Sequence, residues 1–494
     1  MQDHVLAIDQ GTSATKCVLV DDRGRIVSKA AAPLRERYPQ PGWVEQDPDD
    51  IWRSVQQAVH ACLAQAGPLR VAAVGLSTQR ESALVWERAT ARAVTPLLSW
   101  QDQRTVALRD RIATDRVEAL VRERSGLPLD PMFSALKLCW LLDEHDVSRS
   151  RAASGAWCMG TVDAWLLACL GAEPVIEVGN ASRTQLLNVH TADWDDDLLA
   201  LFRIPRAALP RPVPSRGHLA DAGVLHPALA GVPVRAVMAD SHSALFAHGA
   251  YAPGQVKATL GTGSSVMGLT DGTRAPHPGL CTTIAWDSGS GPVQALEGNI
   301  RAAGATLRWV AGLFGLSSDE AASLAAAGRS DGVCLVPGFT GLGAPWWDPH
   351  AVGLISGLTL ATGRDTLLAA AVESIAHQVA DVVDAMDASV TGIARLLLDG
   401  GPSQNAHLRD LISACIDRPV VHCSDAELSA LGVAHLAGLD AGLWGWDALR
   451  SLPRTQQQSR SADRREATAA ARSRWAHAVA QARLRAPMKQ GSAE

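Results

Sequence analysis

Short apolar runs separated by turn residues open the chain. Val5–Ile8 and Cys17–Val20 are apolar, Gly11, Thr12 and Ser13 lie between them, and residues 22–25 lead into Ile26 and Val27. Apolar runs of this length, broken by Gly, Asp and Ser, predict strands joined by tight turns. We therefore expect the chain to begin with neighbouring strands of one sheet.

A helix is predicted directly after these strands. Asp47 provides a cap, Pro48 occupies the first helical position, and Gly67 follows the last apolar residue of "DPDDIWRSVQQAVHACLAQAG". Pro is favoured at the start of a helix and Gly just beyond its end. The segment "VAAVGLSTQ" then reads as a buried strand, and this alternation predicts an α/β fold with helices on the faces of a sheet.

The strand–turn–strand pattern recurs in the second half of the chain. "GQVKATLGTGSSVMGLT" places a turn at residues 261–263, and Gly400 and Gly401 link a further apolar run through Ser403 to a predicted helix. Gly and Pro between residues 246 and 254 indicate a boundary. The sequence thus predicts three parts: a domain over residues 1–248, a second over 249–450, and a helical appendage, read as a solvated helix, over 451–494.

Composition narrows the class of protein. Of 494 residues, 47% are apolar and 19% charged, and the net charge of −6 disfavours partners such as nucleic acid or an anionic membrane. The chain starts without a basic and apolar leader, and it has no apolar run of about 18 residues. The odd count of nine cysteines, without CxxC spacing, suits a reducing compartment. We expect a soluble cytoplasmic protein and allow for a homo-oligomer.

Small-residue turns after strands are candidate phosphate sites, because they let backbone N–H groups and hydroxyls approach phosphate oxygens. The chain contains neither a Walker A motif nor a GxGxxG motif. One such turn is weak evidence, since turns require Gly for steric reasons. A turn opening each half, followed by a strand–Gly–Gly–helix unit, is a stronger indication of nucleotide binding.

The stretch "ADSHSALFAHG" gathers residue types of catalytic sites. Asp240, Ser241 and His242 are the residue types of a hydrolase triad, a metal site or a capped helix. Triad members meet from distant parts of a fold, and adjacent residues rarely point at one centre. The apolar run that follows, ended by Gly249, favours a helix that starts with an Asp or Ser cap.

Several longer motifs resemble one known family, the FGGY carbohydrate kinases, and within it most closely the glycerol kinases. The resemblance runs from about residue 5 to about residue 445. One family signature is matched throughout residues 132–144, and the other over residues 353–373 except at Thr366. The further motifs are "IDQGTSATK", "YPQPGWVEQDP", "STQRESALVWE", "GTVDAWLL", "NASRTQLLNVHTADWDD", "FTGLGAPWWDP" and "LDGGPSQN".

This resemblance implies an actin/hexokinase/Hsp70-like ATPase fold, in which two ribonuclease-H-like domains close around a cleft. It also implies ATP and Mg²⁺ as cofactors, with Asp9 holding the metal directly or through water. Lys16 and Arg308 stand where glycerol kinases usually have Arg and Gln. The residues implied at the nucleotide are Thr12, Ser13, Lys16 and Thr262 at the phosphates, and Gly304, Arg308, Gly401 and Asn405 at the nucleoside.

For the acceptor, the resemblance implies that Arg80 and Glu81 grip the hydroxyls and that Trp100 packs on the carbon chain. Asp240 would be the general base. A charged pair can bind vicinal hydroxyls through charge-assisted hydrogen bonds. A carboxylate near the reacting hydroxyl can accept its proton during phosphoryl transfer.

The chain departs from glycerol kinases at substrate-pocket positions. Met132 replaces a Tyr, Ser241 a Gln and Ser265 a Phe, which predicts a roomier pocket. Asp102 and Arg104 also resemble the Trp-x-Asp-x-Arg of pentulose kinases.

We therefore expect an ATP-dependent kinase that acts on a small polyol or sugar, with glycerol as the leading acceptor. A pentulose, another ketose or another polyol is the alternative acceptor. A different class, an ATP-gated binding module like the Hsp70 or actin relatives, also shares the fold. The retained acceptor residues favour the enzyme, because a switch module needs no polyol grip.

Overall fold

The computed structural model describes residues 3–390, 392–425, 427–459 and 465–484. These described residues form two compact units, which we treat separately. The first comprises Met1–Tyr251, Thr282–Ala295 and Glu427–Pro453, and the second comprises Ala252–Cys281, Leu296–Ala426 and Arg454–Glu494. Each unit is thus assembled from segments that are distant in the sequence.

The first unit is built on a mixed sheet with strand order β13-β14-β5-β1-β2-β3. β1 pairs antiparallel with β2 and parallel with β5, β5 pairs parallel with β14, and β13 and β3 pair antiparallel at the two edges. The bounds are β1 Asp3–Gln10, β2 Ala14–Asp21, β3 Ile26–Pro33, β5 Arg70–Thr78, β13 Arg216–Asp221 and β14 Pro233–Ala239.

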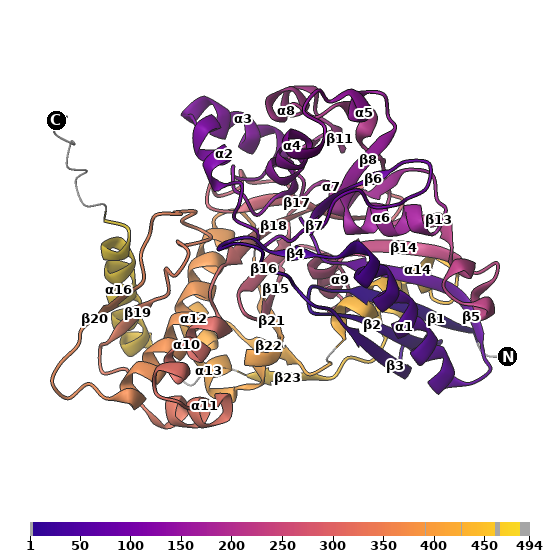
Figure 1. Ribbon diagram of the computed structural model, residues 1–494. Helices are drawn as coiled ribbons and strands as arrows, with labels where there is room; N and C mark the ends of the chain where they lie inside the picture. Colours follow the sequence, from indigo (N-terminus) through magenta and orange to yellow (C-terminus); the bar gives the residue numbers. More distant parts are fainter. Residues whose placement is uncertain (1–2, 391, 426, 460–464, 485–494) are drawn as a thin grey trace, which may run out of the picture. The chain divides into compact units, whose positions relative to one another are not determined.

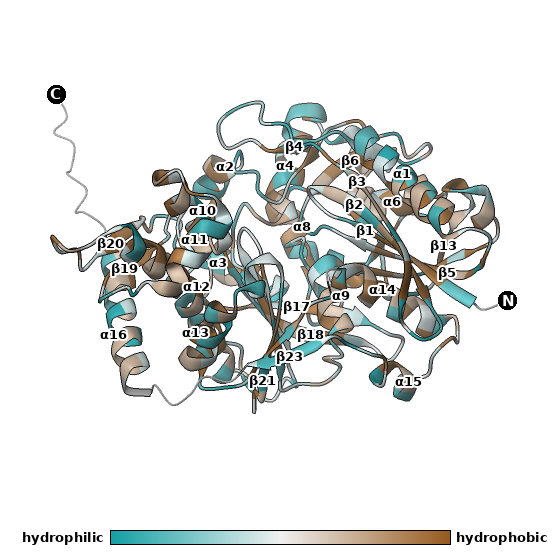
Figure 2. Ribbon diagram, turned by 90° about the horizontal axis from the view of Figure 1, so that it is seen from below, coloured by the Kyte–Doolittle hydropathy of each residue, from teal (hydrophilic) through white to brown (hydrophobic). Residues whose placement is uncertain are grey.

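Helices cover both faces of this sheet. α1 (Pro48–Ala66) packs on β2 and β3, and its Ile51 shares a core with Ile8 and Cys17 (Figure 1). α14 (Leu428–Asp440) covers the other face, because Gly75 lies opposite Ala7 in the sheet and against the backbone of Val433. Figure 2 shows α14 largely in the brown of apolar residues, as burial against the sheet requires.

The local signals for α1 are confirmed. Asp47 caps the helix by accepting a hydrogen bond from the backbone N–H of Asp49, Pro48 is the first helical residue, and Gly67 ends the helix with a φ of 71°. A positive φ of this kind is costly for residues that carry a Cβ atom. The signals were sufficient because each acts within a few residues of the helix end.

The remainder of the first unit surrounds a small sheet of order β4-β7-β6-β8. Its strands are β4 Glu45–Gln46, β6 Ala83–Glu87, β7 Leu97–Leu98 and β8 Trp157–Thr161; the pairs β9 Val175–Glu177 with β12 Arg211–Val213 and β10 Leu187–Asn188 with β11 Asp193–Trp194 lie apart from it. The helices are α2 Val106–Ile112, α3 Asp115–Ser125, α4 Ser134–His145, α5 Ser150–Ala153, α6 Val162–Cys169, α7 Val178–Ala181, α8 Asp196–Phe202, α9 Asp240–Ala247 and α15 Trp446–Arg450. Most of β17 (Cys281–Asp287) also belongs here.

The second unit repeats the strand order of the first. Its sheet runs β18-β16-β15-β21-β22-β23, with β15 antiparallel to β16, β15 and β22 parallel to β21, and β23 antiparallel to β22. The bounds are β15 Gln255–Leu260, β16 Ser264–Leu269, β18 Pro292–Ile300, β21 Arg395–Asp399, β22 Val420–Cys423 and β23 Gln456–Ser459. The similar openings seen in the sequence therefore correspond to equivalent strand pairs.

One helix of the described residues, α12 (Arg364–Asp387), is long and apolar enough to cross a membrane by length and composition alone. Of its most apolar window, 78% is buried inside the second unit, where Leu368, Ile375 and Val379 belong to the core. Its apolar character therefore fits a core helix. The other elements are α10 Gly304–Leu313, α11 Ser318–Ala327, β19 Cys334–Val336, β20 Leu354–Ser356, the 3₁₀ helix η4 Gly401–Gln404, α13 Ala406–Ile416 and α16 Arg465–Ala482.

The expectation of a solvated C-terminal helix is wrong for one face of α16. Trp475 and Val479 are buried among Val336 and Leu342. The indole Nε1 of Trp475 donates to Asp381 on α12 at 2.7 Å. Among the described side chains of α16, two of the four buried residues, Ala478 and Ala482, are Ala, so its apolar stripe is weak in the sequence. Residues 460–464 and 485–494 of the expected appendage lie outside the described residues.

Candidate active site

The parallel strands of the first unit bring the predicted acceptor and metal residues to one edge of the sheet. Asp9 lies near the end of β1 and pairs with Ser77 of β5, and Ala239 at the end of β14 pairs with Thr78. The carboxyl ends of parallel strands meet at the same edge, which is where α/β sheets bind ligands. Arg80, Glu81 and Asp240 follow these strand ends.

Asp9 lies in a concentration of negative charge. Its Oδ1 accepts a hydrogen bond from Ser77 Oγ at 2.9 Å. Withdrawal from water, together with the nearby Asp240 and Glu427, raises the pKa of Asp9 to about 7, although Ser77 and Lys16 oppose the shift. A cation at this carboxylate would relieve the repulsion.

The first small-residue turn is hydrogen-bonded to Trp100, which is predicted to contact the acceptor substrate. Thr12 Oγ1 accepts a hydrogen bond from the indole Nε1 of Trp100 at 3.1 Å. Ser13, beside it, is exposed. Lys16 at the start of β2 forms an ion pair with Glu427 at 3.0 Å. The turn therefore carries two hydroxyls and is followed by Lys16, donor groups that suit phosphate.

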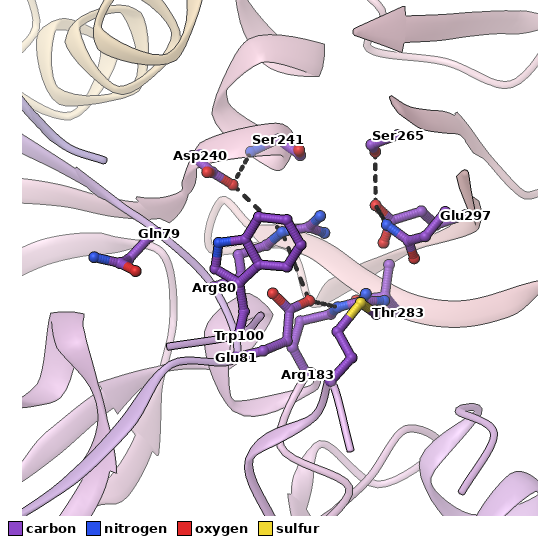
Figure 3. Close-up of polar contacts among 12 residues, drawn as sticks. Gln79, Arg80, Glu81, Trp100, Arg183, Asp240, Ser241, Ser265, Thr283 and Glu297 are labelled. Atoms are coloured by element: carbon purple, nitrogen blue, oxygen red, sulfur yellow. Dashed lines mark hydrogen bonds and ion pairs between the residues drawn. The ribbon is translucent and has the colours of Figure 1, made fainter. Parts of the chain in front are cut away.

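Arg80, Glu81 and Asp240 form a cluster of charges in which Arg80 and Glu81 are buried (Figure 3). Arg80 Nε lies 3.3 Å from Asp240 Oδ1 and 3.8 Å from Glu81 Oε1. The side chain of Arg80 is 7% exposed and that of Asp240 is 36% exposed. The base candidate thus keeps access to solvent, while the cation beside it is enclosed.

The stretch around Asp240 begins a helix, as expected, but its cap differs from the prediction. α9 starts at Asp240 itself, and the cap position is Ala239, whose side chain cannot accept a hydrogen bond. Asp240 Oδ1 instead accepts from the backbone N–H of Ser241 at 2.6 Å. Asp240 is therefore the first helical residue and lies at the positive end of the helix dipole.

Met132 lies in a segment that other residues hold firmly. Its backbone N–H donates to Asp130 Oδ1, and its carbonyl accepts from Lys137 Nζ at 2.6 Å. Lys137 is fully buried, and burial lowers its pKa to about 8. Ser134, two residues after Met132, donates from Oγ to the carbonyl of Glu81 at 2.9 Å. The Met132 segment is therefore hydrogen-bonded to the backbone of Glu81.

The segment that carries Trp100 is fixed by a buried ion pair. Arg104 donates to both carboxylate oxygens of Asp102 at 2.8 to 3.0 Å and to Glu45 at 2.8 Å. Its guanidinium carbon lies 3.8 Å from the ring centre of Trp43 and 4.8 Å from that of Trp140. Asp102 and Arg104, which resemble the pentulose kinase motif, thus hold in place the segment that carries Trp100.

In the second unit, the second phosphate-turn candidate lies against the start of α10. The backbone N–H groups of Ala303 and Gly304 donate to the carbonyls of Thr262 and Gly261 at 2.9 Å. A Cβ atom on Gly304 would lie 2.6 Å from the Gly261 carbonyl, so only Gly allows this approach. Arg308, one turn along α10, donates from Nη2 to Thr262 Oγ1 at 2.9 Å.

The Gly–Gly turn after β21 completes this group. Gly400 has a φ of 90°, and a Cβ atom there would overlap the backbone of Leu260. Gly401 begins η4 with open space where its Cβ atom would be. Asn405 caps α13 through Oδ1 and the N–H of Leu408. Pro402 lies within 3.0 Å of the Cβ position of Gly304, so the predicted nucleotide residues of this unit lie together.

Family models match both halves of the chain. The model described as the FGGY family of carbohydrate kinases, N-terminal domain, matches residues 4–247, and the model of the C-terminal domain of that family matches residues 256–441. The chain belongs to the FGGY family of carbohydrate kinases. It is an ATP-dependent kinase of sugars or polyols, with the mixed α/β actin/hexokinase-like ATPase fold.

Individual relatives cover nearly the whole of this FGGY kinase. It is 41% identical to an apulose kinase from Pectobacterium atrosepticum over 97% of its own length and 98% of that protein. It is 40% identical to a glycerol kinase from Citrifermentans bemidjiense over 94% and 96% of the two chains. The crystal structure of Plasmodium falciparum glycerol kinase with ADP superimposes with a TM-score of 0.90, at 26% identity, over 98% and 99% of the chains.

The donor set of this FGGY kinase fits Mg²⁺ better than a metal that needs a protein cage. No group of three or more His, Cys, Asp or Glu that could hold a metal occurs among the described residues. Mg²⁺ usually keeps several waters and is bound by one or two carboxylates together with substrate phosphates. Asp9, crowded by other carboxylates beside the phosphate turn, fits that mode of binding.

Sequence reasoning missed two residues of the first unit that contact the predicted site. Arg183 donates from Nε to Glu81 Oε1 at 2.7 Å, and Glu427 pairs with Lys16. Arg183 lies inside the motif "NASRTQ", which was used only as a family signal. The signal that could have found it is its charge within a segment of otherwise small and neutral residues.

Ser265 of the second unit is hydrogen-bonded to a buried carboxylate. Its Oγ donates to Glu297 Oε1 at 2.6 Å (Figure 3), and Asn299 Nδ2 donates to the same oxygen at 3.1 Å. The position where glycerol kinases have Phe is therefore polar in this FGGY kinase.

Proposed function

We propose that this FGGY kinase transfers the γ-phosphoryl group of Mg-ATP to a hydroxyl of glycerol, giving glycerol 3-phosphate. The observation that carries the proposal is the enclosed pair of Arg80 and Glu81 beside Asp240. Buried charges of opposite sign next to a partly exposed carboxylate offer both a grip for vicinal hydroxyls and a proton acceptor. An ATP-gated binding module would need neither.

Asp240 is proposed as the general base. It would accept the proton of the reacting hydroxyl, while Arg80 and Glu81 hold the neighbouring hydroxyls and Trp100 packs against the carbon chain. Because phosphoryl transfer has a loose transition state, little deprotonation is needed early, and a carboxylate is a sufficient base. Met132 and Ser241 are proposed to line the same pocket.

The second unit is proposed to hold the nucleotide. Thr262 is the candidate for phosphate contact in this unit, and the candidates in the first unit are Thr12, Ser13 and Lys16. The residues proposed at the nucleoside are Gly304, Arg308, Gly401 and Asn405. Mg²⁺, held by Asp9 directly or through water, would supply positive charge that stabilises the charge on the phosphates. The functional division into an acceptor part (residues 1–248) and a nucleotide part (residues 249–450) is part of this proposal.

We also propose that the reaction takes place in the cytoplasm. The cysteines are free thiols in the part of the chain that the structure describes, and most are buried, which suits a reducing compartment. The net charge of −6 supports a small-molecule substrate in preference to nucleic acid or an anionic membrane.

An acceptor panel tests the proposed substrate. Purified protein with Mg-ATP is assayed for ADP release with glycerol, other small polyols, linear pentuloses and a branched ketose. We expect the highest kcat/KM with glycerol. A higher value for a branched or longer acceptor would instead match the smaller side chains at positions 132, 241 and 265. ATP binding without phosphorylation of any acceptor would favour the binding module.

Substitution of the base tests the mechanism. We expect Asp240→Asn to lower kcat by about 10²–10⁴-fold, because proton acceptance is lost while the hydrogen-bonding shape is kept. Nucleotide affinity should remain. Asp221→Asn is the matched control, since Asp221 is exposed on β13 and contacts His218. Unchanged turnover of Asp240→Asn would remove Asp240 from the role of base.

A further inference from the structure

Glu81 lies in a tight turn with an unfavourable backbone conformation. Its φ is +60°, in the left-handed region that residues with a Cβ atom rarely adopt. The N–H of Ser82 donates to the carbonyl of Arg80 at 2.6 Å, which closes a three-residue turn around Glu81. Such turns are rare and strained, and they persist only where surrounding contacts hold them.

Several contacts hold this turn from different elements. Ser134 at the start of α4 donates to the Glu81 carbonyl. Ser82 Oγ donates to Gln79 Oε1 at 2.8 Å and accepts from the N–H of Trp100 at 3.0 Å. The side chain of Glu81 receives Arg183 Nε at 2.7 Å. The backbone and the carboxylate of Glu81 are therefore fixed independently.

Arg183 is well placed to fix a carboxylate. Its side chain is fully buried, and its guanidinium carbon lies 5.0 Å from the ring centre of Phe133. Its backbone follows α7, whose first turn is capped by the buried side-chain oxygens of Glu177, which accept from the N–H groups of Gly179 and Asn180. The guanidinium is thus carried by a rigid segment and packed on an aromatic ring.

The charges around Glu81 indicate what the contact between Arg183 and Glu81 does. Arg80 lies closer to Asp240, at 3.3 Å, than to Glu81, at 3.8 Å. Arg183 satisfies Glu81 at the shorter distance of 2.7 Å. Without Arg183, the buried carboxylate of Glu81 would lose the cation that lies 2.7 Å from it, and it would compete with Asp240 for Arg80.

We propose that Arg183 is a positioning residue of the acceptor site. It holds the carboxylate of Glu81 in one orientation, and it thereby leaves Arg80 beside Asp240. This inference rests on the proposed function, since it assumes that Arg80 and Glu81 bind the acceptor. Arg183 itself acts through Glu81.

Steady-state kinetics of Arg183→Met and Arg183→Lys test the inference. For Arg183→Met we expect the acceptor KM to rise about tenfold or more, which is the effect of losing one charge-assisted hydrogen bond, while the ATP KM stays within about twofold. Arg183→Lys, which keeps the charge but loses the planar fork, should recover part of the acceptor affinity and guards against a folding failure of the Met variant.

A double-mutant cycle shows whether Arg183 acts through Glu81. If it does, adding Arg183→Met to Glu81→Gln should raise the acceptor KM by less than about threefold beyond the Glu81→Gln variant alone. Arg149→Met is the matched control, because Arg149 pairs with Asp143 in the same unit at α4 and away from the turn. Its acceptor KM should equal that of the unaltered protein.

The outcomes separate the inference from the proposed function. If the unaltered protein phosphorylates no acceptor in the panel, the proposed function and this inference both fall. If the unaltered protein is active but Arg183→Met keeps its acceptor KM, the inference alone is overturned. Equal rises in the KM values for acceptor and ATP, or fully additive losses in the cycle, would show a merely structural role and would also overturn it.

Discussion

Replacing Arg104 by Met should destabilise the first unit severely, because the change leaves a buried carboxylate without its cation. The side chains of Arg104 and Asp102 are 1% and 0% exposed. Arg104 provides hydrogen bonds to both oxygens of Asp102, and after its removal the backbone N–H groups of Val44 and residue 104 still donate to that carboxylate.

The expected loss is about 3–5 kcal/mol in the free energy of unfolding, the usual cost of removing one partner of a buried ion pair. The contacts of the guanidinium with the rings of Trp43 and Trp140 add to this cost at about 0.5–2 kcal/mol each, although such terms are not fully additive. Urea unfolding followed by tryptophan fluorescence measures this loss of unfolding free energy, since both indoles pack against the side chain that is replaced.

Arg25→Met is the matched control, because Arg25 also donates twice to an aspartate, Asp21, but its side chain is 59% exposed. It should cost at most about 1 kcal/mol, as surface pairs do. Adding Asp102→Asn to Arg104→Met should recover part of the loss by neutralising the stranded charge. If Arg104→Met costs no more than Arg25→Met, the reasoning from burial is refuted.

Further predictions concern pH, the C-terminal helix and the nucleotide. Burial raises the pKa of Glu177 from 4.5 to about 8, so its contribution to stability is complete below pH 4.5 and is lost as the pH rises through 8. The unfolding free energy should therefore fall across this pH range, and Glu177→Gln should make the fall smaller. Urea titrations at several pH values measure the difference. Trp475→Ala should destabilise the second unit by about 3–5 kcal/mol, measured by calorimetry, because it empties a buried site and removes a donor to Asp381. Arg308→Gln should raise the ATP KM about tenfold and weaken its salt dependence, because a cation beside the Thr262 turn is lost.

Each of these expectations has a contrary outcome. Parallel pH profiles for Glu177→Gln and the unaltered protein would show that Glu177 is ionised in the folded state. A loss below about 1 kcal/mol for Trp475→Ala would show that α16 is only loosely attached to the second unit. An unchanged ATP KM for Arg308→Gln would remove Arg308 from the nucleotide site, and Arg364→Gln, at an exposed pair with Asp365, is its control.

Local signals predicted the parts of this fold that local forces determine. The bounds of α1 follow from Asp47, Pro48 and Gly67, and each of them acts on its own helix end. The predicted cap of α9 was wrong. Asp240 is adjacent to the observed cap, Ala239, and which of the two residues is the cap depends on where β14 ends. Motifs pointed to Arg80, Glu81 and Asp240, which follow strand ends that the fold brings together, and their role at the acceptor stays a prediction.

Long-range associations had no signal in the sequence. Residues 282–295 and 427–453 join the first unit although the second unit lies around them in the chain. The contact of Arg183 with Glu81 joins residues that are 102 positions apart. The burial of α16 was hidden because half of its described buried stripe is Ala, which gives little hydrophobic contrast with the Ala residues on its exposed face. These features arise from packing between segments, which residue patterns within one segment do not encode.

The discontinuous first unit constrains how a growing chain can fold. α14 closes one face of its sheet, with Val433 against Gly75, and it is synthesised only after residues 252–426. At about 5–20 residues per second, that interval lasts on the order of 10–35 s. During this time the apolar side of β1, β5 and β14 lacks its cover, so the nascent protein offers a binding surface to chaperones until translation reaches α14. Slower translation between the two segments should therefore lengthen the exposure and increase aggregation.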